Sequence, residues 1–372
     1  MPLQTLSLRN ALLTLLATAA VFTALPSAAC TTFRLQSADG AWVIGRSQEF
    51  GPSLDSQVML VPRNYRLNGV KPDFSPGMSW KTKYGFLGIN TLGFDIPSDG
   101  MNEAGLSANA LYIPGFFEYQ PYPAHGGQAI GNVDLVNWAL SQFATVQEVS
   151  RALSTISVYA VDVPFGMGVQ PLHWAFRDAQ GGSIVVEYVD GRLQVHDNPL
   201  GVLANAPNFP WHMANIRAHV NLTNINVDGV QLGTQFFAPL GQGSGLTGLP
   251  GDFTSPSRFL RATALAYSTL PADTALGAVN AAFHILNALD IPIGAVAERI
   301  VNKEGKPDRL EYEQTQWVTV YDLTNRKAYF RTYQNLNIKM VDLGEFDFTG
   351  DAIVHVPMDN TMQAENLTPA TK

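Results

Sequence analysis

The only cysteine of this chain, Cys30, directly follows a segment that resembles a cleavable export signal. Residues 1–29 carry one charge, Arg9, then an apolar run over residues 11–25, and end in small residues at positions 27–29. A basic start, a short apolar stretch and small residues before the cut are typical of secretory signal peptides. The apolar run is shorter than the ~20 residues that a transmembrane helix needs. Cleavage after Ala29 would make Cys30 the first residue of the mature chain.

Composition narrows the class of protein that follows this signal. The chain has 372 residues, of which 46% are hydrophobic and 15% charged, and its mean hydropathy is +0.02. These values are typical of a soluble globular protein and exclude a disordered or multi-span membrane chain. A net charge of -8 leaves no basic surplus for phosphates, so we expect no nucleic acid partner. We also expect no stable membrane insertion once the signal is removed, and a secreted or periplasmic bacterial location.

The patterning beyond Cys30 predicts one domain over residues 30–372, with a polar tail from about residue 357. An Asp39-Gly40 turn between two alternating segments predicts a hairpin near the start. Strands are predicted at residues 31–36, 42–45, 57–61, 86–89, 106–113, 172–177, 183–189, 192–195, 314–321 and 327–333, and helices at 133–143, 146–153, 210–219, 257–269 and 273–289. Strands, then helices, then strands favour an α+β fold, with helices covering sheets.

Several cofactor and catalytic motifs are missing or lack their structural context. Residues 243–248 (GSGLTG) match a dinucleotide-binding pattern, but Leu249-Pro250-Gly251 follows, so no helix is predicted there and we expect a flexible loop. The sequence contains no G-x-S-x-G and no H-E-x-x-H. One cysteine excludes an internal disulfide, an iron–sulfur cluster and a cysteine-type zinc site. We therefore expect neither a metal nor an organic cofactor.

A cysteine at the N-terminus of a chain can act as a nucleophile without a separate histidine. Its own α-amine has a pKa of about 7.7–8.0 and can take the thiol proton near neutral pH. The thiolate would attack an amide carbonyl, pass through a tetrahedral oxyanion and form a thioester that water hydrolyses. Such a site needs hydrogen-bond donors for the oxyanion and charged groups that hold the thiol and the amine.

Five short motifs resemble those of the choloylglycine hydrolase and penicillin V acylase family. They are residues 30–32 (CTT), 45–50 (GRSQEF), 100–106 (GMNEAGL), 203–207 (LANAP) and 257–261 (SRFLR), in the order that the family has. The resemblance implies an N-terminal-nucleophile hydrolase with an αββα four-layer sandwich that hydrolyses linear, non-peptide amides of small molecules without a cofactor. It also implies a homo-oligomer such as a tetramer.

The resemblance also implies roles for individual residues. Cys30 matches the nucleophile, and Arg46 matches an arginine beside the sulfur that would favour the thiolate. Asn205 matches an asparagine of the oxyanion hole, and Arg258 matches a second arginine that orders the site. Taken singly, Arg46, Asn205 and Arg258 are more typical of a solvated strand-end charge, a turn residue and a charge on a helix face. Their joint placement favours the catalytic interpretation.

Three positions depart from the pattern that the family commonly has. Glu49 stands in place of an aspartate that fixes the α-ammonium group, so the charge is kept with one more methylene. Tyr112 stands where the bile-salt-cleaving branch tends to have asparagine, and resembles the penicillin acylase branch. It could donate its backbone N–H to the oxyanion while its ring lines the pocket. Gln48 replaces a methionine and would make one pocket wall more polar.

Residues 112–123 (YIPGFFEYQPYP) are rich in aromatic side chains and contain three prolines and a glycine. We expect an aromatic loop over an apolar pocket, with Phe116, Phe117 and Tyr119 contacting the substrate. The alternative is that these rings pack a long loop against the body of the protein.

Three substrates compete within the amidase interpretation: penicillin V, acyl-homoserine lactones and conjugated bile salts. Because Tyr112 adds a flat ring, we expect penicillin V or a long-chain acyl-homoserine lactone to be hydrolysed better than glycocholate. A conjugated bile salt hydrolase is the alternative. A different class of protein is a lipid-anchored binding protein, in which Cys30 carries the lipid.

Overall fold

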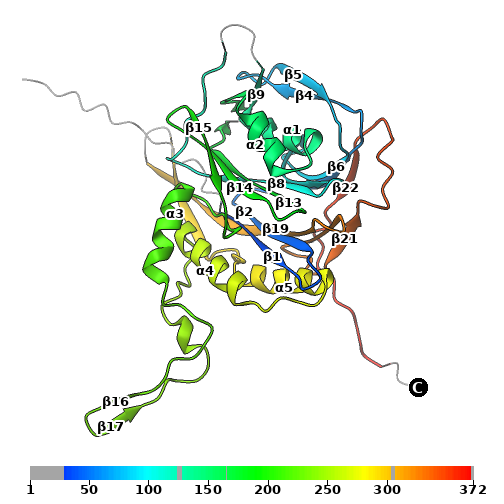
Figure 1. Cartoon of the computed structure of the whole chain (residues 1–372). Helices are drawn as coiled ribbons and strands as arrows, with labels where there is room; N and C mark the ends of the chain where they lie inside the picture. Colours follow the sequence, from blue (N-terminus) through cyan, green and yellow to red (C-terminus); the bar gives the residue numbers. More distant parts are fainter. Residues whose placement is uncertain (1–28, 124–127, 165, 303–305, 370–372) are drawn as a thin grey trace, which may run out of the picture.

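Two antiparallel sheets lie face to face in the computed structural model, which describes residues 29–123, 128–164, 166–302 and 306–369 (Figure 1). Apart from Ala29, the predicted signal peptide lies outside these residues. The first sheet has the order β1 (Cys30–Gln36), β2 (Trp42–Phe50), β19 (Pro307–Asp322), β20 (Lys327–Thr332) and β21 (Lys339–Asp342), with β18 (Val296–Val301) also paired to β19. The second has the order β15 (Arg192–Asp197), β14 (Ser183–Val189), β13 (Leu172–Asp178), β8 (Leu106–Tyr112), β7 (Phe94–Asn102), β6 (Phe86–Thr91), β3 (Gln57–Val61) and β22 (Val354–Pro357).

Helices cover the outer face of each sheet, which gives the expected αββα order of layers (Figure 1). α1 (Leu135–Gln142) and α2 (Val146–Leu153) pack on the second sheet, whereas α4 (Ser255–Ser268) and α5 (Ala275–Asn287) pack on the first. α3 (Phe209–Asn215) packs on α4. Thr145 and Thr274 cap α2 and α5 by accepting hydrogen bonds from backbone N–H groups of the first turn. None of the helices in the described ranges combines the length and apolarity that a membrane span needs.

Apolar side chains fill the space between the layers. Ile44, Leu87, Met101, Trp317 and Tyr321 are among those buried between the two sheets. A second cluster lies under α1 and α2, and a third includes Phe33 and Val318 together with residues of α4 and α5. The alternation of side chains along each strand therefore assigns one face of β1 and β2 to the inter-sheet layer and the other face to the helices.

The predicted hairpin is confirmed, since Gly40 adopts a φ of 89° in the turn that joins β1 to β2. Most predicted strands and helices lie within a few residues of those observed. The sequence did not predict β7, β18, β21, β22, or the hairpins of β4 (Arg66–Val70) with β5 (Pro76–Lys81) and of β16 (Val230–Leu232) with β17 (Gln235–Phe237). The remaining short elements are β9 (Ala129–Gly131), η1 (Asn132–Asp134), β10 (Ser157–Tyr159), β11 (Asp162–Val163), β12 (Gly168–Val169), η2 (Ile216–His219) and η3 (Ser244–Leu246).

The β16–β17 hairpin forms the end of an arm that extends away from the layered body (Figure 1). The glycine-rich residues 243–248 close the base of this arm, where the side chain of Asn226 accepts hydrogen bonds from the backbone N–H groups of Gly243 (2.7 Å) and Ser244 (3.2 Å). A Cβ at Gly245 would lie 2.0 Å from the carbonyl oxygen of Ile225. The glycines therefore permit a close backbone approach at the arm's base.

Candidate active site

Cys30 is the first residue of β1 and lies opposite Gln48 of β2, with 1% of its surface exposed. Residues that face each other across antiparallel strands share one side of the sheet, and their neighbours point to the other side. Cys30, Arg46 and Gln48 accordingly share the side that faces the second sheet. Thr31 and Glu49 share the side that faces α4. The hairpin thus separates the groups around the thiol from those around the α-nitrogen.

Arg46 is the cation beside the sulfur. Its Nη2 lies 3.9 Å from Cys30 Sγ and also donates to the carbonyl oxygen of Ala110 (2.7 Å) and to Gln48 Oε1 (2.6 Å). Its guanidinium lies 5.1 Å from the centre of the Trp317 ring. Burial raises the pKa of the Cys30 thiol, and the positive charge of Arg46 opposes that shift. Arg46 therefore lowers the pKa of the thiol, as expected, but desolvation of the thiol raises it by more.

Asn205 contacts the nitrogen of Cys30. Its Oδ1 accepts a hydrogen bond from that backbone N–H (2.6 Å) and another from Arg258 Nη2 (2.7 Å). Because an arginine can only donate, these contacts fix which end of the amide is oxygen. The Nδ2 group then points to the carbonyl oxygen of Tyr112, at 2.9 Å. That bond uses one of its two hydrogens and leaves the other for a further acceptor.

Arg258, on α4, joins the residues around the α-nitrogen. Besides Asn205, it donates from Nη1 to the carbonyl oxygen of Cys30 (2.6 Å) and to the hydroxyl of Thr31. The helix therefore supplies a fully buried cation to the first two residues of β1. This placement differs from a solvated charge on a helix face.

Glu49 is completely buried, and one of its oxygens has no hydrogen-bond partner in the described part of the chain. Thr315 donates to the other oxygen at 3.0 Å. Burial raises the pKa of Glu49 to about 8, although the charge of Arg258 lowers it. In this structure the Ala29–Cys30 peptide bond is intact, and the Ala29 carbonyl accepts a hydrogen bond from the backbone N–H of Glu49 (2.8 Å). Cys30 N is thus an amide here and has no basic lone pair.

The backbone of Tyr112 turns toward Asn205. Tyr112 lies opposite Leu172 of β13, but it is Ile113 N–H that bonds across, to the carbonyl oxygen of Pro171 (2.7 Å). In this register both polar backbone groups of Tyr112 face away from β13, and the pairing of β7 with β8 ends at Asp99 and Asn109, before it reaches Tyr112. The carbonyl meets Asn205, and the N–H lies on the same side. This geometry is compatible with the predicted second oxyanion donor.

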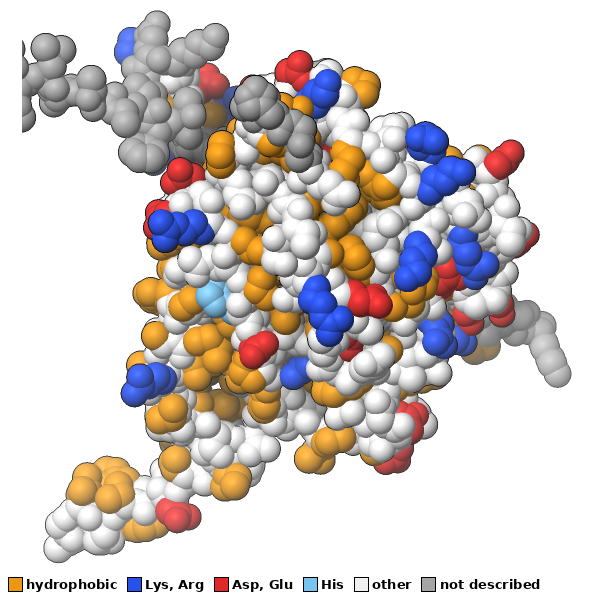
Figure 2. All heavy atoms as spheres, turned by 45° about the horizontal axis from the view of Figure 1, so that its top comes forward, with side chains coloured by type: hydrophobic (Ala, Val, Ile, Leu, Met, Phe, Trp, Pro, Cys, Tyr) orange, Lys and Arg blue, Asp and Glu red, His pale blue; other side chains and the backbone are white. Residues whose placement is uncertain are grey.

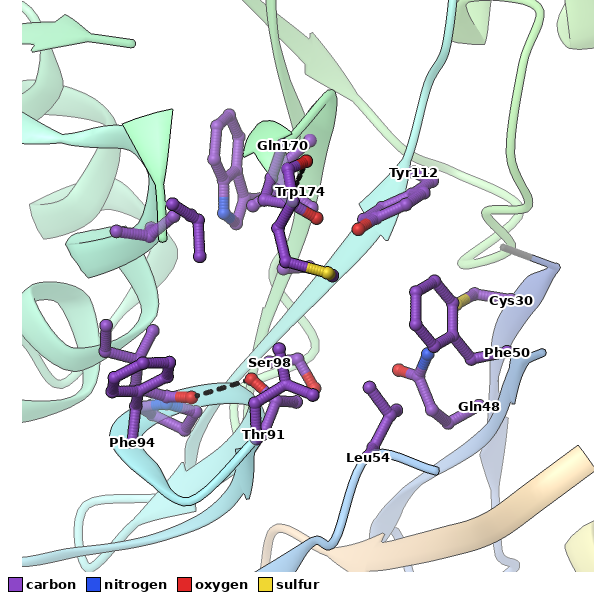
Figure 3. Close-up of a pocket in the computed structure, with 18 residues that line it drawn as sticks. Cys30, Gln48, Phe50, Leu54, Thr91, Phe94, Ser98, Tyr112, Gln170 and Trp174 are labelled. Carbon is purple, nitrogen blue, oxygen red and sulfur yellow. Dashed lines mark hydrogen bonds between the residues drawn. The ribbon is translucent and has the colours of Figure 1, made fainter. Parts of the chain in front are cut away.

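A cavity opens beside these residues, with Tyr112, Phe50 and Cys30 together on one side of it (Figure 3). The Phe50 and Tyr112 rings meet edge to face with centres 6.1 Å apart. The lining comprises Cys30, Gln48, Phe50, Leu54, Thr91, Leu92, Phe94, Ile96, Pro97, Ser98, Ala110, Tyr112, Val133, Val163, Met167, Gln170, Leu172 and Trp174. The wall is mostly apolar. Ser98 Oγ and Trp174 Nε1 are buried donors without a hydrogen-bond partner among the described residues.

Phe116, Phe117 and Tyr119 of the aromatic loop do not line this cavity, contrary to the expectation from its composition, whereas Tyr112 does. Phe116 is 43% exposed, whereas Tyr119 is buried and its hydroxyl donates to the carbonyl oxygen of Gln170 (2.8 Å). Phe117 packs beside Tyr119, with ring centres 5.4 Å apart. These rings fix the loop to the core under α1 and α2, which was the alternative interpretation. The observed wall comes instead from residues 91–98 and 163–174, whose sequences gave no pocket signal.

Among the described residues, no group of three or more His, Cys, Asp or Glu side chains is arranged to hold a metal ion.

Comparison with known proteins identifies the family. The model for linear amide C–N hydrolases of the choloylglycine hydrolase family matches residues 30–356. The chain belongs to this family. It is 33% identical over 342 residues to a bile salt hydrolase/transferase of Clostridium perfringens, covering 91% of this chain and 99% of the relative.

Solved structures of the choloylglycine hydrolase family share the fold. A variant of the conjugated bile acid hydrolase from Clostridium perfringens superposes with a TM-score of 0.79 at 31% identity, over 91% of this chain and all of that one. Penicillin V acylase from Agrobacterium tumefaciens has the same fold, with a TM-score of 0.68 at 23% identity, over 88% of this chain and 91% of that one. This member is thus a hydrolase of the linear amide class with the expected N-terminal-nucleophile fold.

Proposed function

We propose that Cys30, freed at its amine by cleavage after Ala29, is the nucleophile of this amide hydrolase. The observation that carries the proposal is the convergence of Cys30, Arg46 and Asn205 beside one apolar cavity. An apolar cavity with a few placed polar groups is typical of a small-molecule site. The acyl part of the substrate would occupy the cavity, and its amide carbonyl would lie at the sulfur.

The geometry supports a role for each residue in the reaction. The free amine of Cys30 would take the thiol proton, and Arg46 would stabilise the thiolate. Attack on the carbonyl carbon would move charge to its oxygen, where the unused hydrogen of Asn205 Nδ2 and the N–H of Tyr112 would donate. The amine would then protonate the leaving nitrogen, and water would hydrolyse the thioester. Glu49 and Arg258 would hold the charged terminus in place.

We propose conjugated bile acids as the substrate class, the alternative that the sequence left open. Support comes from the relatives at 33% and 31% identity, which are named for bile salts and conjugated bile acids. The unpartnered donors Ser98 Oγ and Trp174 Nε1 add to it, because hydroxyl groups on an otherwise apolar ring system could satisfy them. The edge-to-face pair of Tyr112 and Phe50 favours penicillin V as a second candidate, since a phenoxy ring could stack there.

Parallel assays test both the substrate class and the role of Cys30 as nucleophile. They use protein whose mass shows that it begins at Cys30. We expect kcat/KM to be highest for glycocholate, lower for penicillin V and lowest for a long-chain acyl-homoserine lactone. A clear preference for penicillin V would restore the ranking based on Tyr112.

Cys30→Ser and Cys30→Ala should lose most activity while remaining folded. Full activity of correctly processed Cys30→Ala would contradict the nucleophile assignment.

Two further proposals concern the mature protein. Residues 1–29 would direct export to the periplasm or the medium, with cleavage after Ala29 rather than lipid attachment at Cys30. Intact mass decides between these fates, because a lipid adds hundreds of daltons and acylation blocks the amine. The mature chain would assemble as a homo-oligomer through its arm, where Leu232, Phe236 and Phe237 are each more than half exposed. Figure 2 shows hydrophobic side chains gathered at the end of this arm.

A further inference from the structure

A buried cluster of two histidines and one glutamate contacts the backbone at Asn205. We name His173, Glu187 and His212 the imidazole cluster. His173 belongs to β13, Glu187 to β14 and His212 to α3, and none is more than 1% exposed. Three elements of the fold therefore converge on a short loop that has no helix or strand of its own.

The cluster donates to two consecutive carbonyl groups. His173 Nε2 lies 2.9 Å from the carbonyl oxygen of Ala204, and His212 Nε2 lies 2.9 Å from that of Asn205. The preceding residue, Leu203, exchanges backbone hydrogen bonds with Thr32 of β1 at 2.8 and 2.9 Å. Every backbone carbonyl from Leu203 to Asn205 is thus held by a donor from another element.

The two histidines differ in the contacts of their second ring nitrogen. The second nitrogen of His173, Nδ1, lies 3.0 Å from Glu187 Oε1. Burial alone would raise the pKa of Glu187, but the contact with His173 and the nearby His196, whose Nε2 lies 3.6 Å from Oε2, hold that pKa at about 2, so this carboxylate only accepts. Both nitrogens of His173 therefore face oxygen atoms, Glu187 Oε1 on one side and the carbonyl oxygen of Ala204 on the other. Burial lowers the pKa of His212 to about 4, so His212 donates as a neutral ring.

We propose that His173 and His212 are positioning residues for amide hydrolysis, which fix the backbone of Asn205 so that its Nδ2 meets the developing oxyanion. Glu187 serves the same end by holding the His173 ring in place through its contact with Nδ1. The inference rests on the proposed role of Asn205. A displacement of about 1 Å at such a donor costs on the order of 100-fold in rate. The cluster therefore acts on kcat without touching the substrate.

His173→Gln tests the inference, because glutamine can donate to Ala204 or to Glu187 but cannot bridge both. We expect kcat for the best of the three amide substrates to fall about 10-fold or more, with KM changed less than about twofold. Alkylation of Cys30 by iodoacetamide should keep its wild-type rate, because that reaction needs the thiolate and no oxyanion donor. A merely structural role would lower both rates together.

A double-mutant cycle with Asn205→Ala completes the test. If the cluster acts through Asn205, adding His173→Gln to Asn205→Ala should lower kcat no further. Glu187→Gln keeps the size of the side chain, so it gives the same readout if His173→Gln does not fold. Leu153→Ala, in the core under α2, is the control for lost stability and should keep wild-type kcat.

Three results would overturn the inference. The first is wild-type kcat in both His173→Gln and Glu187→Gln when Asn205→Ala is impaired. The second is a multiplicative loss in the double variant. The third is wild-type kcat in Asn205→Ala itself, which would reject the proposed oxyanion role and the cluster's purpose with it.

Discussion

At the scale of the residue, Glu49 is a buried acid whose desolvation outweighs the nearby charge of Arg258. Its pKa is raised to about 8 by burial in the uncut chain, against 4.5 for an ordinary glutamate. The folded state therefore binds a proton that the unfolded state has lost between these two values. Stability conferred by that proton is complete below pH 4.5 and is lost as the pH rises through 8.

We predict that the free energy of unfolding of the uncut protein falls between about pH 5 and pH 8, by up to about 1.4 kcal/mol per pH unit. Glu49→Gln should remove most of this slope, and the cut protein should show a smaller one, because its α-ammonium group supplies a positive partner. Urea unfolding across this pH range measures all three. Equal slopes for uncut wild type and Glu49→Gln would contradict the prediction.

At the scale of the element, Asp99 on β7 connects the two sheets. It is completely buried and accepts hydrogen bonds from Thr319 (2.6 Å) and Tyr321 (2.8 Å) of β19. Its Oδ2 also lies 3.6 Å from Arg46 Nη1. The same carboxylate thus balances the buried charge of the arginine beside the sulfur.

We predict that Asp99→Ala lowers the free energy of unfolding by about 3–5 kcal/mol, because it leaves Arg46 buried without its carboxylate partner. Thr319→Val removes one hydrogen bond to the same oxygen and should cost only about 1 kcal/mol. Urea titrations of the two variants provide the comparison. A loss in Asp99→Ala no greater than that in Thr319→Val would show that the ion pair contributes little.

The example of β7 shows why part of the fold escaped prediction. Residues 97–100 (PSDG) have the composition of a turn, yet they form a central strand because Asp99 is satisfied by polar groups of the facing sheet. Such pairings join residues more than 200 positions apart and leave no local pattern. The β1–β2 hairpin was predictable because alternation and a turn signal are local. Cys30, Arg46, Asn205 and Arg258 could be named because each lies in a short motif.

The cavity wall was harder to predict than the polar site. Leu92, Ile96 and Met167 have no distinguishing neighbours in sequence and meet only where hairpins and loops converge. The aromatic loop was predicted wrongly for the opposite reason. Its composition is typical of a pocket lining, but the Tyr119 ring packs near Trp174 and its hydroxyl donates to the carbonyl oxygen of Gln170. Short sequence motifs therefore predicted the polar residues of the site, whereas the apolar wall of the cavity depends on tertiary packing.

At the scale of the whole molecule, the arm that ends in the β16–β17 hairpin exposes apolar side chains to solvent. Leu232, Phe236 and Phe237 lie on its outer hairpin with 60%, 57% and 51% of their surfaces exposed. Exposed apolar groups gathered in this way are typical of interaction sites.

We predict that the triple variant Leu232→Ser, Phe236→Ser and Phe237→Ser shifts the protein to a smaller assembly without lowering the stability of the isolated body. Light scattering after size exclusion measures the mass, and far-UV circular dichroism confirms the fold. An unchanged mass would locate the contact between copies elsewhere.

The buried peptide bond between Ala29 and Cys30 also bears on whether cleavage precedes folding. Ala29 is 5% exposed and Cys30 is 1% exposed, and both are already paired with β2 in the uncut chain. If a separate peptidase makes the proposed cut after Ala29, it needs this bond in a more exposed state than the one seen here. We therefore expect such an enzyme to remove residues 1–29 before the hairpin closes. A chain that folds with this bond intact keeps the nitrogen of Cys30 as an amide, although Asn205 and Arg258 already lie around it.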